Sequence, residues 1–298
     1  MFRIALVGAG RMGQTHLAAL KVSDTVTITA IVEPRESVSE TLSQAGYTVF
    51  DSIGALLDAG GVDGFLVATP SGFHLEAIRQ LAPAGLPILC EKPCGLTVAE
   101  ASAVKEIVTA TGVRLQVGYW RRFVPQLVAL KKDIDAGVLG RLLLVHASQW
   151  DRLPPAAEFR NTSGGILTDM GVHEIDVIQW LTGATIVSVT GLATMSDTEG
   201  VVDEDAAAYS IALSTGVIGI ATLGRFYPGA DVVGFEVMGD KGHARIDVLT
   251  ETDGERVQME ALREQAEAFA RGDSPNAATI DDALSALRAV SLSRESSH

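Results

Sequence analysis

In the first 120 residues, short apolar runs alternate with stretches in which apolar residues recur every three or four positions. An apolar run bounded by turn residues is typical of a buried strand, and the wider spacing is typical of a helix. The strands expected on this basis are 3–7, 27–32, 64–68, 87–90 and 114–117. The expected helices are 12–21, 37–45, 52–58, 73–84 and 98–111. This alternation predicts an α/β domain, a doubly wound parallel sheet of the Rossmann type with helices on both faces.

The pattern changes after about residue 120, where strand-like runs follow one another more closely. Helices are expected at 125–136, around Asp169, at 259–270 and at 279–293. Strands are expected at 142–150, 186–194, 206–213, 217–226, 234–238 and 244–248. Turn residues separate consecutive strands, so we expect them to pair antiparallel in an open sheet. The sequence thus predicts a Rossmann domain over 1–120 and an α+β domain over 121–298, and leaves open whether the C-terminal helix packs back on the first domain.

One helix of the second domain carries a polar stripe on an otherwise apolar surface. In "TDMGVHEID" (168–176), Asp169, His173 and Asp176 are four and three positions apart, which places them on one helical face. A buried polar group without a partner costs roughly 2 to 7 kcal/mol, so the stripe requires a metal, another side chain or a substrate. An aspartate and a histidine four apart suit a metal, but no third ligand is evident in the sequence, and we expect none.

A glycine-rich loop follows the first expected strand. "VGAGRMG" places Gly8, Gly10 and Gly13 in G-x-G-x-x-G spacing before a helix, and Glu33 ends the second expected strand. In this arrangement the glycines permit a tight turn, a close approach of a pyrophosphate and close packing of the helix, whose first N–H groups attract the anion. The context predicts a dinucleotide site.

The residues after the second strand bear on which dinucleotide binds. Glu33 can accept hydrogen bonds from the adenosine ribose and would repel a 2′-phosphate, which favours NAD over NADP. Arg35 could neutralise that phosphate, so NADP remains the less favoured alternative. His74, in "LVATPSGFH", is interpreted either as a residue near the cofactor or as a packing residue.

Composition narrows the classes of partner. The 298 residues carry a formal net charge of −14 with a pI near 4.8, which argues against binding to a phosphate backbone. No apolar run approaches the length of a membrane span and the start shows no signal-peptide pattern, so we expect a cytoplasmic protein. Cys90 and Cys94 are expected as two buried thiols rather than a disulfide or a zinc site.

Several segments occur in the order typical of one enzyme family. They are "GAGRMG", "ATPSGFH", "CEKP", "GYWRRF", "TSGGILTDMGVHEIDVIQWLTG" and "VDEDAAAYSIALSTGVIG". Together these segments span nearly the whole chain. In their order, the chain resembles the glucose-fructose oxidoreductase and inositol dehydrogenase family of NAD(P)-dependent enzymes, and most of all the inositol 2-dehydrogenase branch of that family. The resemblance implies an N-terminal Rossmann domain and a C-terminal α+β domain with an open, mainly antiparallel sheet.

The resemblance also implies a catalytic trio. In this family the lysine of the E-K-P segment and the Asp and His of the stripe converge at the nicotinamide, and here they match Lys92, Asp169 and His173. His173 would act as general base, Lys92 would polarise the reacting oxygen, and Asp169 would orient His173 or bind a neighbouring hydroxyl. The bond before Pro93 is often cis in the family.

Further site residues complete the prediction. The cofactor-binding candidates are Gly8, Gly10, Arg11, Met12, Gly13, Glu33, Arg35, Thr69, Pro70, His74, Glu91 and Lys92. The substrate-binding candidates are Lys92, Arg122, Trp150, Asp151, Asp169, His173 and Tyr227. Arg121 or Arg122 contacts a ligand or forms a surface ion pair, and Asp176 contacts the substrate or forms a hydrogen bond at the helix surface or between domains. The charges of "DED" (203–205) are expected to be solvated.

The function expected from these residues and the resemblance is NAD-dependent oxidation of a secondary alcohol in a cyclic polyol or sugar, with inositol isomers first. The alternatives are a keto-sugar reductase or an NAD-dependent redox glycosidase of the same family, or a non-catalytic NAD-binding regulator. A homodimer or homotetramer is expected, because in the family the apolar face of the second sheet is covered by another subunit.

Overall fold

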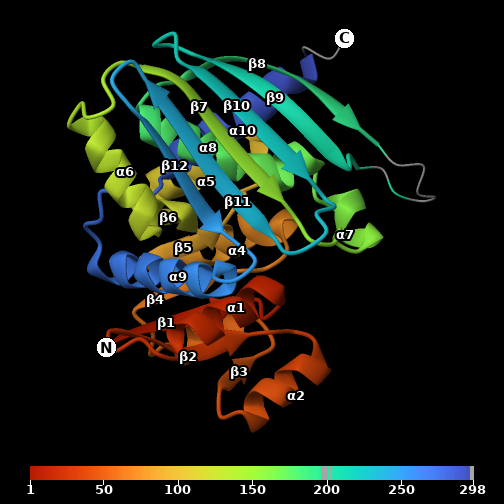
Figure 1. Ribbon diagram of the computed structural model, residues 1–298. Coiled ribbons are helices and arrows are strands. Elements are labelled where there is room, and N and C mark those ends of the chain that lie inside the picture. The colour runs from red at the N-terminus through yellow and green to blue at the C-terminus, as the bar shows by residue number, and fades with distance from the viewer. Residues whose placement is uncertain (196–200, 202, 296–298) are drawn as a thin grey trace. The chain divides into compact units, whose positions relative to one another are not determined.

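The computed structural model describes residues 1–195, 201 and 203–295, which form two compact units (Figure 1). The first unit comprises Met1–Trp120 together with Met259–Ala283. The second comprises Arg121–Gln258 together with the chain from Leu284 onward. Each unit is built around one sheet, and each contains segments that are far apart in the sequence.

The sheet of the first unit is entirely parallel. Its strands are β1 (Phe2–Val7), β2 (Val26–Val32), β3 (Thr48–Phe50), β4 (Gly64–Val67), β5 (Ile88–Glu91) and β6 (Leu115–Gly118). They lie in the order β3-β2-β1-β4-β5-β6, which is the doubly wound order of dinucleotide-binding folds. The predicted Rossmann sheet is therefore confirmed, and β3, which has only three residues, is an addition that the sequence pattern did not indicate.

The helices of this unit lie close to their expected positions. They are α1 (Arg11–Leu20), α2 (Glu36–Gln44), α3 (Ile53–Ala59), α4 (His74–Leu81) and α5 (Val98–Thr111), with short 3-10 turns at Ser71–Phe73 and Ala82–Ala84. The start of α5 is fixed by a capping box, in which the Thr97 hydroxyl accepts the Glu100 N–H at 3.1 Å and the Glu100 carboxylate accepts the Thr97 N–H at 3.2 Å. Gly112 ends the helix at a φ of +69°.

The core of the first unit includes a helix from late in the chain. The helix α9 (Gly254–Arg271) supplies Phe269, which is fully buried with Ile4, Leu6 and Leu66 of the sheet. The Phe269 ring meets the Phe2 ring edge-on at 6.0 Å. The segment that returns to the Rossmann unit thus consists of α9 from Met259 and the first residues of α10 (Ile280–Glu295), whereas α10 from Leu284 belongs to the second unit.

The second sheet is mixed and mostly antiparallel. Its strands are β7 (Leu142–Trp150), β8 (Ile186–Thr194), β9 (Ala206–Leu213), β10 (Ile218–Gly224), β11 (Val232–Gly239) and β12 (His243–Leu249), in the order β12-β11-β7-β10-β9-β8. The prediction that consecutive strands pair antiparallel is correct for β8–β9, β9–β10 and β11–β12. It is wrong for β7 and β8, which are not neighbours in the sheet. It is also wrong for β10 and β11, because β7 lies between them, parallel to β10 and antiparallel to β11. A turn reverses the chain but does not determine which strand becomes the neighbour.

Helices cover one face of this sheet. The second unit contains α6 (Pro125–Asp135), α7 (Ala157–Thr162), a π-helical turn (Leu167–Gly171) and α8 (Val172–Thr182). The helix α8 packs on β7 and β10 (Figure 1). A Cβ on Gly219 would lie 3.3 Å from the Ile178 side chain. On the opposite face, the exposed side chains include Leu192, Ile218 and Met238. Among the described residues, none of the helices is both long and apolar enough to span a bilayer.

Candidate active site

The glycine loop between β1 and α1 has the geometry that its spacing predicts. Gly8 has a φ of +94°, and a Cβ there would lie 2.8 Å from the backbone of Thr69. A Cβ on Gly13 would lie 2.2 Å from the carbonyl oxygen of Gly8, so glycine is required for α1 to pack this closely. Gly10 has open space where its Cβ would be, and it caps α1 just before Arg11 and Met12. The N–H groups of that first helical turn lie where a pyrophosphate could accept hydrogen bonds.

A cavity of about 550 Å³ opens at the carboxyl ends of β1, β2 and β4. Its lining includes the candidates Gly8, Gly10, Glu33, Arg35, Thr69 and Pro70. Ligands of open α/β sheets bind at this edge, beside the point where the strand order reverses. The glycine loop, the open cavity and the carboxylate at its edge therefore fit one half of a dinucleotide.

Hydrogen bonds from Ala9 and Arg35 hold the Glu33 side chain at the cavity. It is buried, and its carboxylate accepts the Ala9 N–H at 3.0 Å. The Arg35 guanidinium donates to the same carboxylate at 2.8 Å from both Nε and Nη2. The hydrogen bonds from Arg35 keep the pKa of Glu33 below its ordinary value in spite of burial, so the carboxylate is ionised at neutral pH. Because Glu33 already compensates the charge of Arg35, the pair suits a ribose hydroxyl better than a 2′-phosphate.

We expect Glu33→Ser to shift cofactor preference toward NADP. The substitution removes the negative charge and releases Arg35, so the NADP/NAD ratio of kcat/KM should rise at least about tenfold, equivalent to about 1.4 kcal/mol. Parallel steady-state kinetics with both cofactors would measure it, and Glu36→Gln, on the exposed start of α2, is the matched control. An unchanged ratio would contradict the assignment of Glu33 to the ribose.

His74 connects the loops that follow β4 and β5. Its Nδ1 lies 2.8 Å from the Pro93 carbonyl oxygen and its Nε2 lies 2.9 Å from the Thr69 carbonyl oxygen. Burial lowers the pKa of His74, and the two carbonyl oxygens oppose that shift. Since Thr69 lines the cavity and Pro93 follows Lys92, His74 contacts the backbone beside the predicted cofactor site.

Glu91 lies next to the predicted catalytic lysine. Its carboxylate accepts a hydrogen bond from His16 Nε2 at 2.6 Å and another from the Lys92 N–H at 3.2 Å. Burial raises the pKa of the Glu91 carboxyl, but the hydrogen bond and charge of His16 outweigh it and the pKa lies below its ordinary value. The Lys92–Pro93 peptide bond is cis, as the resemblance implies. Glu91 therefore fixes the backbone from which the Lys92 side chain projects.

The two cysteines that flank this segment are free and buried, as expected. Burial raises the pKa of the Cys90 thiol well above its ordinary value, so the thiol stays protonated. Within the described ranges, no group of three or more His, Cys, Asp or Glu side chains is arranged to hold a metal ion.

Asp169 and His173 both lie at the start of the helical segment in the second unit. Asp169 is in the π-helical turn, and His173 is in the first turn of α8, where its side chain is buried. Gly171 separates them, and a Cβ there would lie 2.3 Å from the Leu167 side chain. This close packing fixes the turn that presents Asp169.

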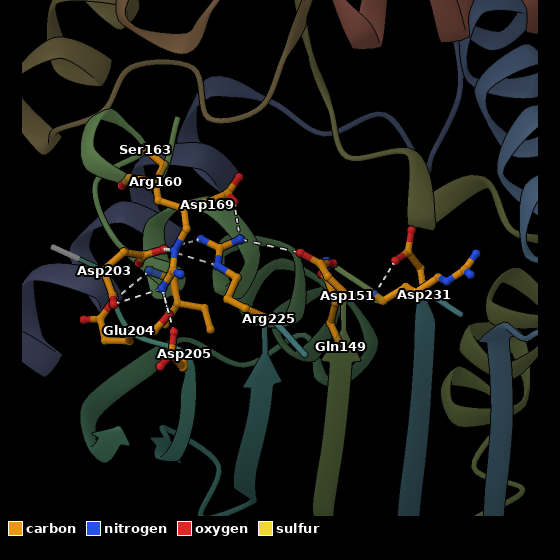
Figure 2. Close-up of polar contacts among 12 residues, drawn as sticks. Gln149, Asp151, Arg160, Ser163, Asp169, Asp203, Glu204, Asp205, Arg225 and Asp231 are labelled. Atoms are coloured by element: carbon orange, nitrogen blue, oxygen red, sulfur yellow. Dashed lines mark hydrogen bonds and ion pairs between the residues drawn. The ribbon is translucent and has the colours of Figure 1, made fainter. Parts of the chain in front are cut away.

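A buried arginine brings two of the predicted substrate residues together. Arg225 Nη1 donates to Asp169 Oδ2 at 2.8 Å and lies 3.6 Å from Asp151 Oδ2 (Figure 2). Trp150, just before Asp151, stacks so closely on β10 that a Cβ on Gly224 would lie 2.0 Å from its ring. Tyr227 follows two residues after Arg225 and is exposed. Arg225 itself was not a sequence candidate, although an arginine inside a predicted apolar strand (217–226) was a signal for it.

The stripe residue Asp176 has a protein partner. Arg122 donates to both carboxylate oxygens of Asp176, at 2.9 Å from Nε and at 2.6 Å from Nη2. Its neighbour Arg121 pairs with Glu174 and also donates to Gln149. All four charged side chains are buried, so the alternative of a surface ion pair is excluded for both arginines, and the hydrogen bonds of Asp176 lie in the interior of the second unit rather than at the helix surface. The reason is that both arginines of the 3-10 turn Trp120–Phe123 face carboxylates of α8 in the interior, where only paired charges are tolerated.

The "DED" segment differs from its expected state. Asp203 is buried and accepts hydrogen bonds from Arg160 and Arg225, both at 3.0 Å, and Asp205 accepts from Arg160 at 2.8 Å (Figure 2). The expectation of solvated charges is therefore wrong for Asp203. A run of acidic residues is normally solvated. Here Asp203 is buried because Arg160 and Arg225, from distant positions in the sequence, compensate its charge.

The strand order, the glycine loop and the cavity define a Rossmann protein that binds a dinucleotide. The family model described as "Oxidoreductase family, NAD-binding Rossmann fold" matches residues 2–119, and the GFO/IDH/MocA C-terminal domain matches residues 127–245. The chain belongs to this GFO/IDH/MocA family, and it is an NAD-dependent oxidoreductase.

Individual relatives agree with this assignment. The chain is 43% identical over 299 residues to the rhizopine catabolism protein MocA of Rhizobium meliloti, covering 99% of this chain and 94% of the relative. It is 33% identical over 246 residues to the myo-inositol dehydrogenase Hyg17 of Streptomyces leeuwenhoekii, covering 80% and 75% of the two chains. A solved structure of a putative myo-inositol dehydrogenase from Sinorhizobium meliloti 1021 is similar with a TM-score of 0.92 at 27% identity, covering 99% and 97%.

Proposed function

We propose that the protein is an NAD-dependent dehydrogenase that oxidises a secondary alcohol of a cyclic polyol, with inositol isomers as the first candidates. The observation that carries the proposal is the presence of a dinucleotide cavity in one unit and of Asp169 and His173, one turn apart, in the other. Several relatives are named as inositol dehydrogenases, which supports the same substrate class.

The proposed reaction assigns a task to each catalytic candidate. NAD, when bound, supplies the acceptor for the hydride that leaves the carbinol carbon. His173 takes the hydroxyl proton, and the ammonium of Lys92 hydrogen-bonds the same oxygen as its negative charge develops. The Asp169 carboxylate accepts a hydrogen bond from a neighbouring hydroxyl or from His173. The alcohol thereby loses a hydride and a proton and becomes a ketone.

A substrate screen tests this proposal. Inositol isomers and common sugars would be supplied with NAD and with NADP in parallel, and NADH formation followed by absorbance. We expect turnover with at least one inositol and a preference for NAD. Consumption of NADH by a keto-sugar would favour a reductase, and release of a leaving group without net NADH would favour a redox glycosidase. A chain that binds NAD but converts no polyol or sugar would be a regulator.

We further propose a homodimer or homotetramer in which a second subunit covers the open face of the second sheet. On that face Ile218 pairs across the strands with Leu144, which in turn pairs with Met238, so apolar side chains adjoin. Ile218 is 51% exposed and Met238 is 43% exposed. An apolar surface of this kind normally marks an interface.

The variant Ile218→Lys/Met238→Lys is expected to be monomeric by light scattering, because the lysines would be desolvated in the interface. Val138→Lys, exposed after α6, is the control and should retain the wild-type mass. An unchanged mass in the double variant would place the interface elsewhere.

A further inference from the structure

Arg225 occupies an unusual position for a charged residue. It follows β10 directly, its side chain is fully buried, and its backbone N–H donates to the Asp205 carbonyl oxygen at 2.7 Å. Burying a guanidinium without compensation is costly, so its carboxylate partners determine what it does. Figure 2 shows Asp203 on one side of the guanidinium and Asp169 and Asp151 on the other.

The two sides of this guanidinium are not equivalent. Nε and Nη2 both donate to the fully buried Asp203 carboxylate, at 3.2 and 3.0 Å. Nη1 instead faces Asp169 and Asp151, whose side chains are 15% and 21% exposed. One edge therefore anchors Arg225 in the interior, while the third nitrogen holds two carboxylates that remain accessible.

The anchor is itself fixed by a second arginine. Arg160 donates to the Asp203 carboxylate at 3.0 Å, to the Asp203 carbonyl oxygen at 3.1 Å and to the Glu204 carbonyl oxygen at 3.3 Å. These bonds restrict the segment that holds Asp203, and through Asp203 they restrict the plane of the Arg225 guanidinium. The position of Nη1 is consequently determined by groups that do not face the solvent.

The charge of Arg225 affects the ionisation of the accessible carboxylates beside it. Burial raises the pKa of the Asp151 carboxyl, the charges of Asp231 and Asp169 raise it further, and a hydrogen bond from Gln149 and the charge of Arg225 oppose the rise. Burial alone would lower the pKa of the Arg225 guanidinium, but Asp169, Asp203 and Asp151 together raise it, so the arginine stays charged. Arg225 is thus a cation shared by two nearby carboxylates, and its charge opposes the rise in the pKa of Asp151.

We infer that Arg225 is a positioning residue for the proposed dehydrogenase reaction. Its Nη1 holds Asp169 and Asp151 side by side as an ionised pair, and this pair accepts hydrogen bonds from hydroxyl groups of the polyol. The inference rests on the proposed function, and it adds a residue that touches neither substrate nor cofactor. Carboxylates are acceptors only, so a fixed pair of them selects a ligand with at least two adjacent donors.

The first test is kinetic and uses Arg225→Met and Arg225→Lys in the full-length protein. Arg225→Met is expected to raise the KM for the polyol and to lower kcat/KM by about 10- to 100-fold, because a charge-assisted hydrogen bond is lost. The KM for NAD should stay near that of the wild type. Arg225→Lys should recover part of the loss, since an ammonium supplies the charge without the planar donor set. Arg245→Met, which removes an exposed arginine paired with Glu236 and Asp247, is the control with wild-type kinetics.

The pH profile separates positioning from general damage. In Arg225→Met the acidic limb of kcat/KM should move to higher pH, because the carboxylates then ionise less readily. Arg160→Lys disturbs the same buried cluster without a bond to Asp169 or Asp151 and keeps the cation of Arg225 beside them, so its limb should move less than that of Arg225→Met. An equal displacement in both variants would overturn the inference, as would wild-type KM and pH dependence in Arg225→Met.

A second measurement does not require turnover. Carboxyl ¹³C titration of aspartate-labelled protein, with the Asp151 signal assigned through Asp151→Asn, should show a higher pKa for Asp151 in Arg225→Met, which removes the cation, than in the wild type. If the wild type oxidised no polyol, the proposed function would fail while this titration still decided the role of Arg225. Should Arg225→Met not fold, Arg225→Gln, which also removes the charge, carries the same comparison, and an unmoved Asp151 titration there would overturn the inference.

Discussion

Replacing Lys92 by methionine is expected to lower kcat by about 10²- to 10³-fold, which is the usual loss when one donor to a developing oxyanion is removed. The affinity for NAD should remain near that of the wild type, because the lining of the cofactor cavity consists of other residues. The Lys92 backbone is held by Glu91, so the substitution changes the side chain alone. Single-turnover hydride transfer and equilibrium NAD binding would measure the two effects separately.

His173→Asn should lower kcat by about 10²- to 10⁴-fold, the range for loss of a general base. Lys105→Met is the control for both variants, since Lys105 lies on the exposed surface of α5 and pairs with Asp281. Loss of NAD binding in either catalytic variant would contradict the assigned role, and full activity would remove the residue from the reaction.

Arg122→Met is expected to produce the largest loss of stability. The substitution leaves the Asp176 carboxylate buried without its bidentate partner, and breaking a buried ion pair in this way costs about 3 to 5 kcal/mol in the free energy of unfolding. Urea unfolding followed by circular dichroism would measure it.

The double variant Arg122→Met/Asp176→Leu separates two contributions to the free energy of unfolding: the penalty for an unpaired buried charge and the net contribution of the ion pair. It should regain most of the free energy of unfolding that Arg122→Met loses, because an apolar pair of similar volume often replaces a buried ion pair with little change in stability. Arg245→Met should change stability by less than about 1 kcal/mol, because its partners are at the surface. A double variant as unstable as Arg122→Met would show that the pair itself, rather than the unpaired aspartate, determines stability.

The Rossmann unit could be predicted from the sequence because its signals are local. The capping box of Thr97 and Glu100 and the spacing of Gly8, Gly10 and Gly13 each act within a few residues, and the structure has both. The neighbours of β10 could not be predicted, because strand pairing across β7 depends on contacts more than 70 residues apart. The three-residue strand β3 was missed because it is too short to show a period.

The second part of the site depends on tertiary pairing and was only partly predictable. The spacing of Asp169, His173 and Asp176 indicated a stripe that needs partners, and the structure assigns Arg225 to Asp169 and Arg122 to Asp176. Neither pairing could be read from the chain, because each arginine lies more than 50 residues from its carboxylate. The convergence of Lys92 with Asp169 and His173 stays a prediction that the variants above test.

The discontinuous first core has a consequence for biosynthesis. The ring of Phe269, from α9, is fully buried among residues of the first sheet, and Ala266 is buried beside it. A nascent polypeptide that has emerged only as far as β6 lacks Phe269 and Ala266. The part of the first sheet that these side chains cover is then exposed to solvent. We therefore expect the Rossmann unit to reach its final stability only after α9 has been translated. By then most of the second unit, which lies between β6 and α9 in the sequence, has already been synthesised.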